Sequence, residues 1–107
     1  MKTVVKENAN GGKGQVVVKY ILDDNELHAK CKIAEVTIAP GCSLGYHEHH
    51  GESETYYIIK GQGEYDDNGT KRPVTVGDKT FTPDGCGHGI ANTGDEDLVF
   101  MALIQLD

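Results

Sequence analysis

The stretch GCSLGYHEHHGESETYYIIKG, residues 41–61, places a short histidine cluster between glycine turns and ends in a β-type run. His47 and His49 lie two residues apart, so on an extended backbone both side chains leave the same face. Glu54 begins the next run after the turn at residues 51–53. An antiparallel fold at that turn would place the Glu54 carboxylate beside the histidine pair. We therefore expect these residues to form part of a metal-binding site.

A second stretch, GDKTFTPDGCGHGIAN at residues 77–92, supplies another candidate ligand. His88 follows the turn at residues 83–87, whose proline and glycines are suited to aiming one imidazole. Three imidazoles and one carboxylate make a site for a divalent transition metal, and the set fits Mn, Fe, Ni, Co, Cu and Zn alike. Six-coordination would leave two positions open for water or substrate.

Runs rich in β-branched and aromatic residues recur along the rest of the chain, separated by Gly, Pro, Asn and Asp turns. The predicted strands are residues 15–22, 31–38, 54–60, 63–66, 73–76, 79–82, 88–92 and 97–105. No stretch of 10–12 residues combines a helical period with caps, and the best short candidate is residues 23–30. This spacing predicts an all-β barrel or sandwich with little or no helix.

Length and composition predict one globular domain over residues 1–107, since 37% of the residues are hydrophobic and 25% are charged. Residues 1–14 are polar and are expected to form an N-terminal arm. The chain has no apolar run of bilayer length, and its first residues lack the apolar core of a signal peptide, which argues against membrane insertion and secretion.

The charge pattern bears on partners and on cellular location. The net charge is −7, Arg72 is the single arginine, and no Lys/Arg cluster exists that would neutralise a nucleic-acid backbone. Nucleic acid is therefore not expected as a partner. Cys31, Cys42 and Cys86 are odd in number and unrelated in spacing, which argues against a disulfide framework and favours the cytoplasm.

The two stretches resemble the two sequence motifs of the cupin superfamily at every fixed position. The matching patterns are Gly41-x5-His47-x-His49-x4-Glu54-x6-Gly61 and Gly77-x5-Pro83-x-Gly85-x2-His88-x3-Asn92. The chain is similar to small bacterial single-domain cupins of the RmlC-like jelly-roll type, often labelled mannose-6-phosphate-isomerase-like. This label describes similarity and is weak support for isomerase activity.

The resemblance implies a double-stranded β-helix barrel with one buried divalent metal ion per chain. It assigns the ligand roles to His47, His49, Glu54 and His88, and it implies a homodimer, commonly one that exchanges N-terminal strands. Asn92 is expected to hydrogen-bond the backbone of a turn and to make no contact with the metal.

Two functions stay open at this point. One is a metalloenzyme, with Mn or Fe as candidate metals, that oxidises, decarboxylates or isomerises a small oxygen-rich molecule. The other is a non-catalytic, metal-containing module that binds a sugar or small acid. The resemblance to cupins also argues against a thiol dioxygenase, because cupins of that kind generally lack an acid at the position of Glu54. A phosphorylated substrate is also disfavoured, because the cations considered, Arg72, Lys60 and Lys79, lie in a hairpin loop or near strand ends.

Strand alternation separates inward from outward side chains. Tyr56 and Ile58 share the parity of Glu54 and should point into the barrel, and Tyr56 is the candidate catalytic residue, as a proton or hydrogen-bond donor. Tyr57 and Ile59 should point outward. Core positions are expected at Phe81, Phe100, Met101 and Leu103.

Several neighbours of the motifs are expected to take no part in the chemistry. His50 has the opposite parity to His47 and His49 and should face out. Glu48 and Glu52 are expected to be solvated turn carboxylates. Cys42 and Cys86 could flank the cavity, with their roles left open.

Overall fold

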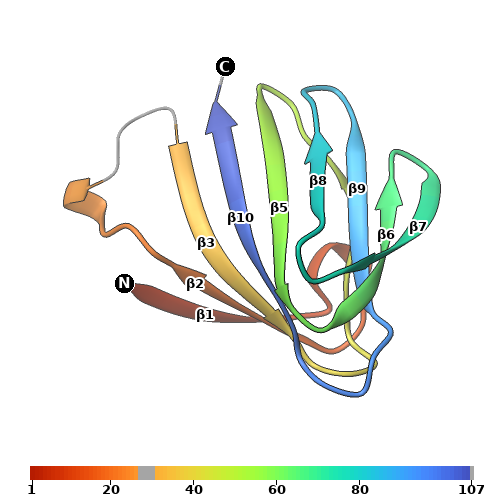
Figure 1. The fold of residues 1–107 in the computed structure, drawn as a ribbon. Helices are drawn as coiled ribbons and strands as arrows, with labels where there is room; N and C mark the ends of the chain where they lie inside the picture. The colour runs from red at the N-terminus through yellow and green to blue at the C-terminus, as the bar shows by residue number, and fades with distance from the viewer. Residues whose placement is uncertain (27–30, 107) are drawn as a thin grey trace.

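Two antiparallel sheets face each other in the computed structural model, which describes residues 1–26 and 31–106 (Figure 1). The six-stranded sheet has the order β1 (Lys2–Glu7), β2 (Gln15–Tyr20), β3 (Cys31–Ile38), β10 (Leu98–Leu106), β5 (Glu52–Lys60) and β8 (Lys79–Thr82). The four-stranded sheet has the order β4 (Ser43–Glu48), β9 (Gly87–Asn92), β6 (Gln62–Asp67) and β7 (Thr70–Thr75). The predicted all-β, double-stranded β-helix barrel is confirmed.

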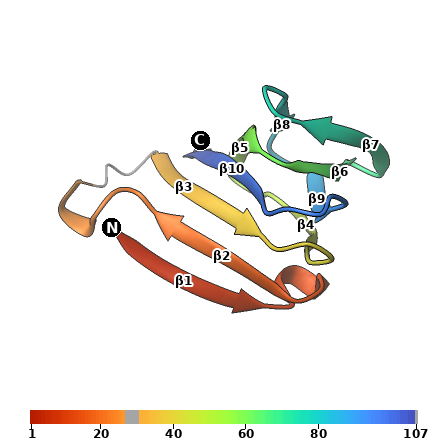
Figure 2. The same cartoon turned by 60° about the horizontal axis from the view of Figure 1, so that its bottom comes forward.

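The core lies between the sheets, and strand alternation builds it. On β3, Ala34, Val36 and Ile38 are buried while the residues between them are half-buried. On β10, Leu98 and Phe100 are fully buried. The register places Ile38 opposite Leu98 and Val36 opposite Phe100, so these side chains share the inner face of the sheet. Figure 2 shows β1, β2 and β3 of this sheet on one side of the molecule and β6 and β7 of the other sheet on the opposite side.

The route from β4 to β5 differs from the antiparallel hairpin considered for residues 51–53. β4 pairs with β9, whereas β5 pairs with β10 and β8 in the other sheet. Gly51 takes a φ of +79° at this crossing, a conformation that favours glycine. The chain therefore passes from one sheet to the other directly after the histidine cluster.

The N-terminal segment forms an edge strand. β1 pairs with β2 over its whole length, from Lys2 opposite Tyr20 to Glu7 opposite Gln15. The 3-10 turn η1 (Ala9–Gly11) then packs against β4, where the Asn10 carbonyl approaches the backbone of Gly45 so closely that a β-carbon there would clash. The segment expected to be an arm is thus folded against the barrel.

Helix is confined to short 3-10 turns among the described residues. η2 (Asp24–Glu26) covers part of the short helical candidate at residues 23–30, and residues 27–30, including His28, lie outside the described residues. No helix in residues 1–26 or 31–106 is long and apolar enough to cross a membrane.

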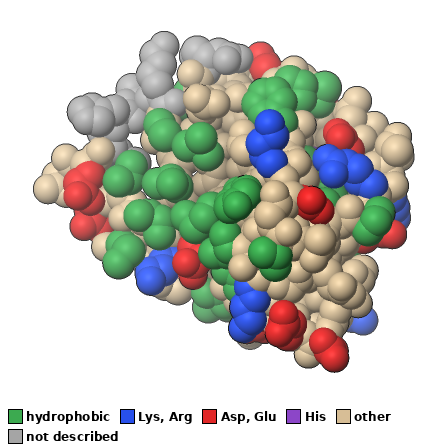
Figure 3. All heavy atoms as spheres, in the orientation of Figure 1, with side chains coloured by type: hydrophobic (Ala, Val, Ile, Leu, Met, Phe, Trp, Pro, Cys, Tyr) green, Lys and Arg blue, Asp and Glu red, His purple; other side chains and the backbone are tan. Residues whose placement is uncertain are grey.

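The outer face of the six-stranded sheet carries exposed hydrophobic side chains. Tyr57 and Ile59 point outward as predicted, but Phe81 is 48% exposed, so its predicted core position is wrong. Met101 and Leu103, also predicted in the core, are only half-buried because they lie opposite Tyr57 and Thr55 on the outward row. Phe81 lies opposite Thr55 on the outward-facing row of β5 and β8, because its β8 neighbours Thr80 and Thr82 take the inward positions. Figure 3 shows hydrophobic side chains gathered where β3, β10 and β5 lie in Figure 1.

Candidate metal centre

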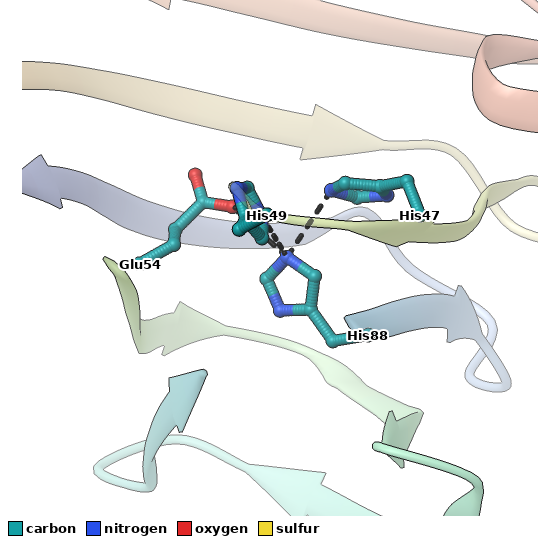
Figure 4. A group of neighbouring side chains, drawn as sticks. All are labelled: His47, His49, Glu54 and His88. Carbon is teal, nitrogen blue, oxygen red and sulfur yellow. Dashed lines mark hydrogen bonds and ion pairs between the residues drawn. The ribbon is translucent and has the colours of Figure 1, made fainter. Parts of the chain in front are cut away.

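Four side chains from both sheets converge at one end of the barrel interior: His47, His49, Glu54 and His88, here called the His/Glu cluster (Figure 4). His47 on β4 lies opposite His88 on β9 in the register, and His49 follows the end of β4. Glu54 comes from β5 in the other sheet. The cluster therefore bridges the two sheets, and the structure brings together all four residues predicted as metal ligands.

The distances between donor atoms fit a six-coordinate ion. His88 Nε2 lies 2.9 Å from His49 Nε2, 3.2 Å from His47 Nε2 and 2.9 Å from Glu54 Oε1. His49 Nε2 lies 3.1 Å from Glu54 Oε1. Ligand atoms at about 2.1 Å from an ion lie about 3.0 Å apart at right angles and about 3.4 Å apart at tetrahedral angles. The observed spacing matches neighbouring positions of an octahedron.

Hydrogen bonds at the far ring nitrogens prepare two histidines for metal binding. His47 Nδ1 lies 2.8 Å from the Gly45 carbonyl, which can only accept, so Nδ1 carries the proton. His49 Nδ1 lies 2.7 Å from Glu52 Oε2, which holds that ring in the same way. In the neutral rings both Nε2 atoms then present lone pairs to the cluster. Lone pairs and a carboxylate facing one another are a fitting environment for a cation.

His88 is held by two hydroxyl groups. Its Nδ1 lies 2.8 Å from Tyr65 Oη and 2.9 Å from Thr82 Oγ1, and these hydroxyls are 2.6 Å apart. Either oxygen can accept the Nδ1 proton and leave Nε2 free. Burial raises the pKa of Tyr65, so its hydroxyl stays protonated. All three side chains are at most 1% exposed, so the ring of His88 is fixed in place.

Tyr56 forms one wall of the centre. Its ring stacks on His88 with the centroids 4.7 Å apart, and its hydroxyl lies 3.4 Å from His88 Nε2. Burial raises the pKa of Tyr56 well above its usual value, and the nearby Glu54 carboxylate raises it further. The phenol therefore remains a hydrogen-bond donor at neutral pH. The inward direction predicted for Tyr56 and Ile58 is confirmed.

Burial also acts on the cluster itself. It lowers the pKa of His47, because charging a partly buried imidazole is unfavourable, and the neighbouring His88 and His49 rings add to this effect. The Gly45 carbonyl and Glu54 act in the opposite direction. His47 is therefore neutral, as a metal ligand must be, over a wider pH range than a free histidine.

A cavity of about 170 Å³ opens beside the cluster. Its lining combines aliphatic side chains with polar, charged and aromatic ones, and three cluster members are among them. The lining residues with polar or charged groups are Lys6, Asn10, Tyr20, Lys32, His47, His49, Glu54 and Tyr56.

Several candidates lie elsewhere. His50 is exposed, as expected, with Nε2 3.5 Å from Glu48 Oε2. Cys42 and Cys86 are free thiols outside the cavity lining. Arg72 belongs to β7, where its guanidinium lies 5.3 Å from the centroid of the Tyr65 ring.

Some functional residues were not found from the sequence. Glu52 was expected to be a solvated carboxylate, but it holds His49 and its side chain is only 25% exposed. Its position three residues after His49 is the signal that could have identified it. Tyr65 and Thr82 carried no such signal, because their contacts with His88 depend on how β6 and β8 are placed relative to β9. Asn92 donates to the Ile38 and Glu96 carbonyls, which confirms its predicted role at a turn.

These features define a cupin: the chain belongs to the cupin domain family, which matches residues 34–104. It is 44% identical over 100 residues to the oxalate-binding protein of Thermotoga maritima, covering 92% of this chain and 83% of that protein. A crystal structure of a predicted oxalate decarboxylase from Thermotoga maritima has a TM-score of 0.94 and 41% identity, covering 100% of this chain and 94% of that one.

A longer relative shares part of its sequence with this chain. The chain is 32% identical over 95 residues to the oxalate decarboxylase of Bacillus subtilis, covering 82% of this chain and 25% of that protein. The chain therefore spans about a quarter of the length of that enzyme. Both comparisons concern proteins named for a small, oxygen-rich ligand.

Proposed function

We propose that this chain is a metal-dependent binding protein for a small dicarboxylate of the oxalate class. In this proposal His47, His49, Glu54 and His88 hold one divalent transition metal. The observation that carries it is the convergence of these four donors at a small cavity. When bound, the ion supplies Lewis-acid coordination for adjacent oxygens of the ligand.

The size of the cavity supports a ligand of this class. An engineered cavity of about 150 Å³ holds benzene, which has six heavy atoms. The cavity beside the cluster has about 170 Å³ and oxalate also has six heavy atoms, so the two are matched in size. Sites for drug-sized ligands are larger, at roughly 300 Å³ or more. The names of two relatives support the same choice.

We propose Mn or Fe as the working metal. Right-angled donor spacing and a carboxylate ligand favour an octahedral ion over tetrahedral Zn. The test-tube affinity order places Cu and Zn above Mn and Fe, so the metal recovered after purification depends on the growth medium.

Calorimetry tests the proposed function. Oxalate is titrated into protein loaded with Mn²⁺ and into the same protein after chelation. We expect saturable binding of about one oxalate per chain in the loaded protein and loss of that binding after chelation. Absence of binding to the loaded protein, or equal binding after chelation, would contradict the proposal.

Turnover is a second candidate, and the placement of Tyr56 favours it. Decarboxylation converts oxalate and one proton into carbon dioxide and formate, and the protonated Tyr56 phenol lies at the cavity wall beside His88. In this candidate Tyr56 donates a hydrogen bond or the proton to the ligand. Formate release is measured for wild type and for Tyr56→Phe. If wild type releases no formate, the chain binds the ligand without converting it. Equal rates of formate release in both proteins would show that Tyr56 takes no part in the reaction.

We also propose a homodimer that buries the outer face of the six-stranded sheet. Support comes from Tyr57, Ile59 and Phe81, which are between 41% and 50% exposed on that face. Exposed apolar patches of this kind mark interaction surfaces. Light scattering should show a dimer for wild type, a monomer for Tyr57→Lys, and a dimer for the control Tyr46→Lys on β4. A monomeric wild type would contradict the proposal.

The cytoplasm is the proposed place of action. Support comes from Cys31, Cys42 and Cys86, which are all free thiols. Free thiols are typical of proteins in a reducing compartment.

A further inference from the structure

Two exposed lysine residues, Lys6 and Lys32, border the cavity beside the His/Glu cluster and take no part in the proposed metal binding. Apart from the cluster, the charged side chains among its described lining residues are Lys6 and Lys32. Neither forms an ion pair with another described residue. The chain as a whole carries a net charge of −7, so two lysines at one cavity, neither paired with a described residue, stand out against its overall charge.

Lys32 lies in line with the cluster. The register places Ile104 opposite Lys32 on β3 and opposite Glu54 on β5, so these three residues form a row across adjacent strands. Opposite residues of an antiparallel pair point to the same face, and here this is the inner face. Two strand spacings separate the backbones of Lys32 and Glu54 by about 10 Å. Lys32 is exposed and lines the cavity, so its long side chain lies at the rim of the cavity.

Lys6 borders the cavity from another direction. It lies on β1 opposite Val16, whose side chain is buried, so Lys6 is on the inward row of that strand. The following turn η1 carries Asn10 to the backbone of Gly45 on β4, two residues before His47. The N-terminal hairpin therefore supplies Lys6 and Asn10 to the lining of the cavity.

From this arrangement we infer that Lys32 and Lys6 recognise the second negative charge of the ligand. This inference rests on the proposed function. A dianion that binds the metal through some of its oxygens directs its remaining carboxylate oxygens into the cavity, part of whose lining is aliphatic. Unpaired charge in such surroundings is unfavourable, and apart from the metal the two ammonium groups are the cations among the described lining residues that can offset it. The lysines thus make the site selective for dianions over monoanions of the same shape.

Oxalate and oxamate provide the matched pair of probes. Both have six heavy atoms and adjacent oxygens, but oxalate carries two negative charges and oxamate one. Their affinities for Mn²⁺-loaded protein are measured by calorimetry for wild type, Lys6→Gln/Lys32→Gln and Lys6→Arg/Lys32→Arg. The control is Lys60→Gln/Lys79→Gln, which makes the same change in net charge outside the cavity lining. Metal content is measured for every variant.

We expect the glutamine variant to bind oxalate about five- to tenfold more weakly, in keeping with two exposed ion pairs, and to bind oxamate almost unchanged. The arginine variant should keep the preference for oxalate, and the control should match wild type. Added salt should weaken oxalate binding more in wild type than in the glutamine variant.

Two results would overturn the inference while the proposed function stands. In one, the glutamine variant binds oxalate as tightly as wild type does. In the other, it loses oxalate and oxamate equally with its metal retained. Failure of the proposed function itself has a different signature, because metal-loaded wild type would then bind neither probe.

Discussion

The space between the two sheets is filled in two different ways along its length. Near the start of β10, Leu98, Phe100 and Ile38 are fully buried and need nothing beyond their own packing. Near its end, where Ile104 lies opposite Glu54, the equally buried His88 and its partners present lone pairs and a carboxylate to one another. Close packing stabilises the first region, and a cation would stabilise the second.

This difference has a consequence for stability. Buried polar groups cost free energy unless they are paired, whereas buried apolar groups contribute to folding directly. The apolar end should therefore determine whether the chain folds, and the polar end should determine whether the folded chain responds to metal. Variants at the two ends should separate these effects.

The largest effect is expected from His88→Ala. Removing a central donor leaves three ligands, and the Tyr65 and Thr82 hydroxyls lose the imidazole that they hold, so metal affinity should fall by more than roughly 100-fold. The melting temperature should no longer rise when Mn²⁺ is added. His50→Ala, at an exposed histidine beside the cluster, is the matched control. A melting curve for His88→Ala that still responds to metal as wild type does would contradict the assignment.

Leu98→Ala should show the opposite behaviour at the apolar end. Truncating this fully buried side chain should lower the free energy of unfolding by about 2–5 kcal/mol. Metal affinity should remain close to that of wild type, because Leu98 lies far along β10 from Glu54's partner Ile104. Denaturant unfolding and metal titration measure the two quantities. Large losses in both would show that the two regions are not independent.

Glu52→Gln tests whether the Glu52 carboxylate positions His49 for metal binding. Glu52 holds the His49 ring through Nδ1, and losing such a carboxylate typically weakens metal binding by about 10- to 100-fold. Glu48→Gln is the control, since Glu48 lies on the exposed side of β4. Competition with a chelator gives the affinities. Equal affinities for the two variants would show that Glu52 does not position His49.

The smallest effect concerns pH in the metal-free protein. Because burial lowers the pKa of His47, the folded chain binds fewer protons there than the unfolded chain, whose histidine titrates near 6.5. This contribution to stability is full above about pH 6.5 and is lost as the pH falls toward the lowered pKa, by at most about 1.4 kcal/mol per pH unit. Unfolding at several pH values should show a shallower decline for His47→Gln. If stability declines with falling pH as steeply in His47→Gln as in wild type, His47 does not contribute to the pH dependence of stability.

The sequence predicted the barrel and the four cluster residues because both depend on local spacing. Alternation in residues 31–38 fixed one face of β3, and glycine turns fixed where strands end. The two motifs already contained His47, His49, Glu54 and His88 in order. These features do not depend on how the two sheets pack against each other.

What the sequence did not predict depends on contacts between distant strands. Phe81 looks like a core residue in isolation, and only the pairing of β8 with β5 turns it outward. Lys32 joins the cavity through its row with Ile104, and Lys6 through the folding of the N-terminal hairpin onto β4. From the sequence, the cations weighed for substrate binding were Lys60, Lys79 and Arg72, and none of them was expected at the site.

Metal content is the most direct test of the central claim, that the His/Glu cluster holds one divalent transition metal. Untagged wild-type protein and His49→Ala are purified without chelator from cells grown in a defined mixture of metals and measured by mass spectrometry. The prediction is close to one metal ion per chain in wild type and close to none in His49→Ala. Wild type that stays metal-free after reconstitution, or equal metal in both proteins, would contradict it.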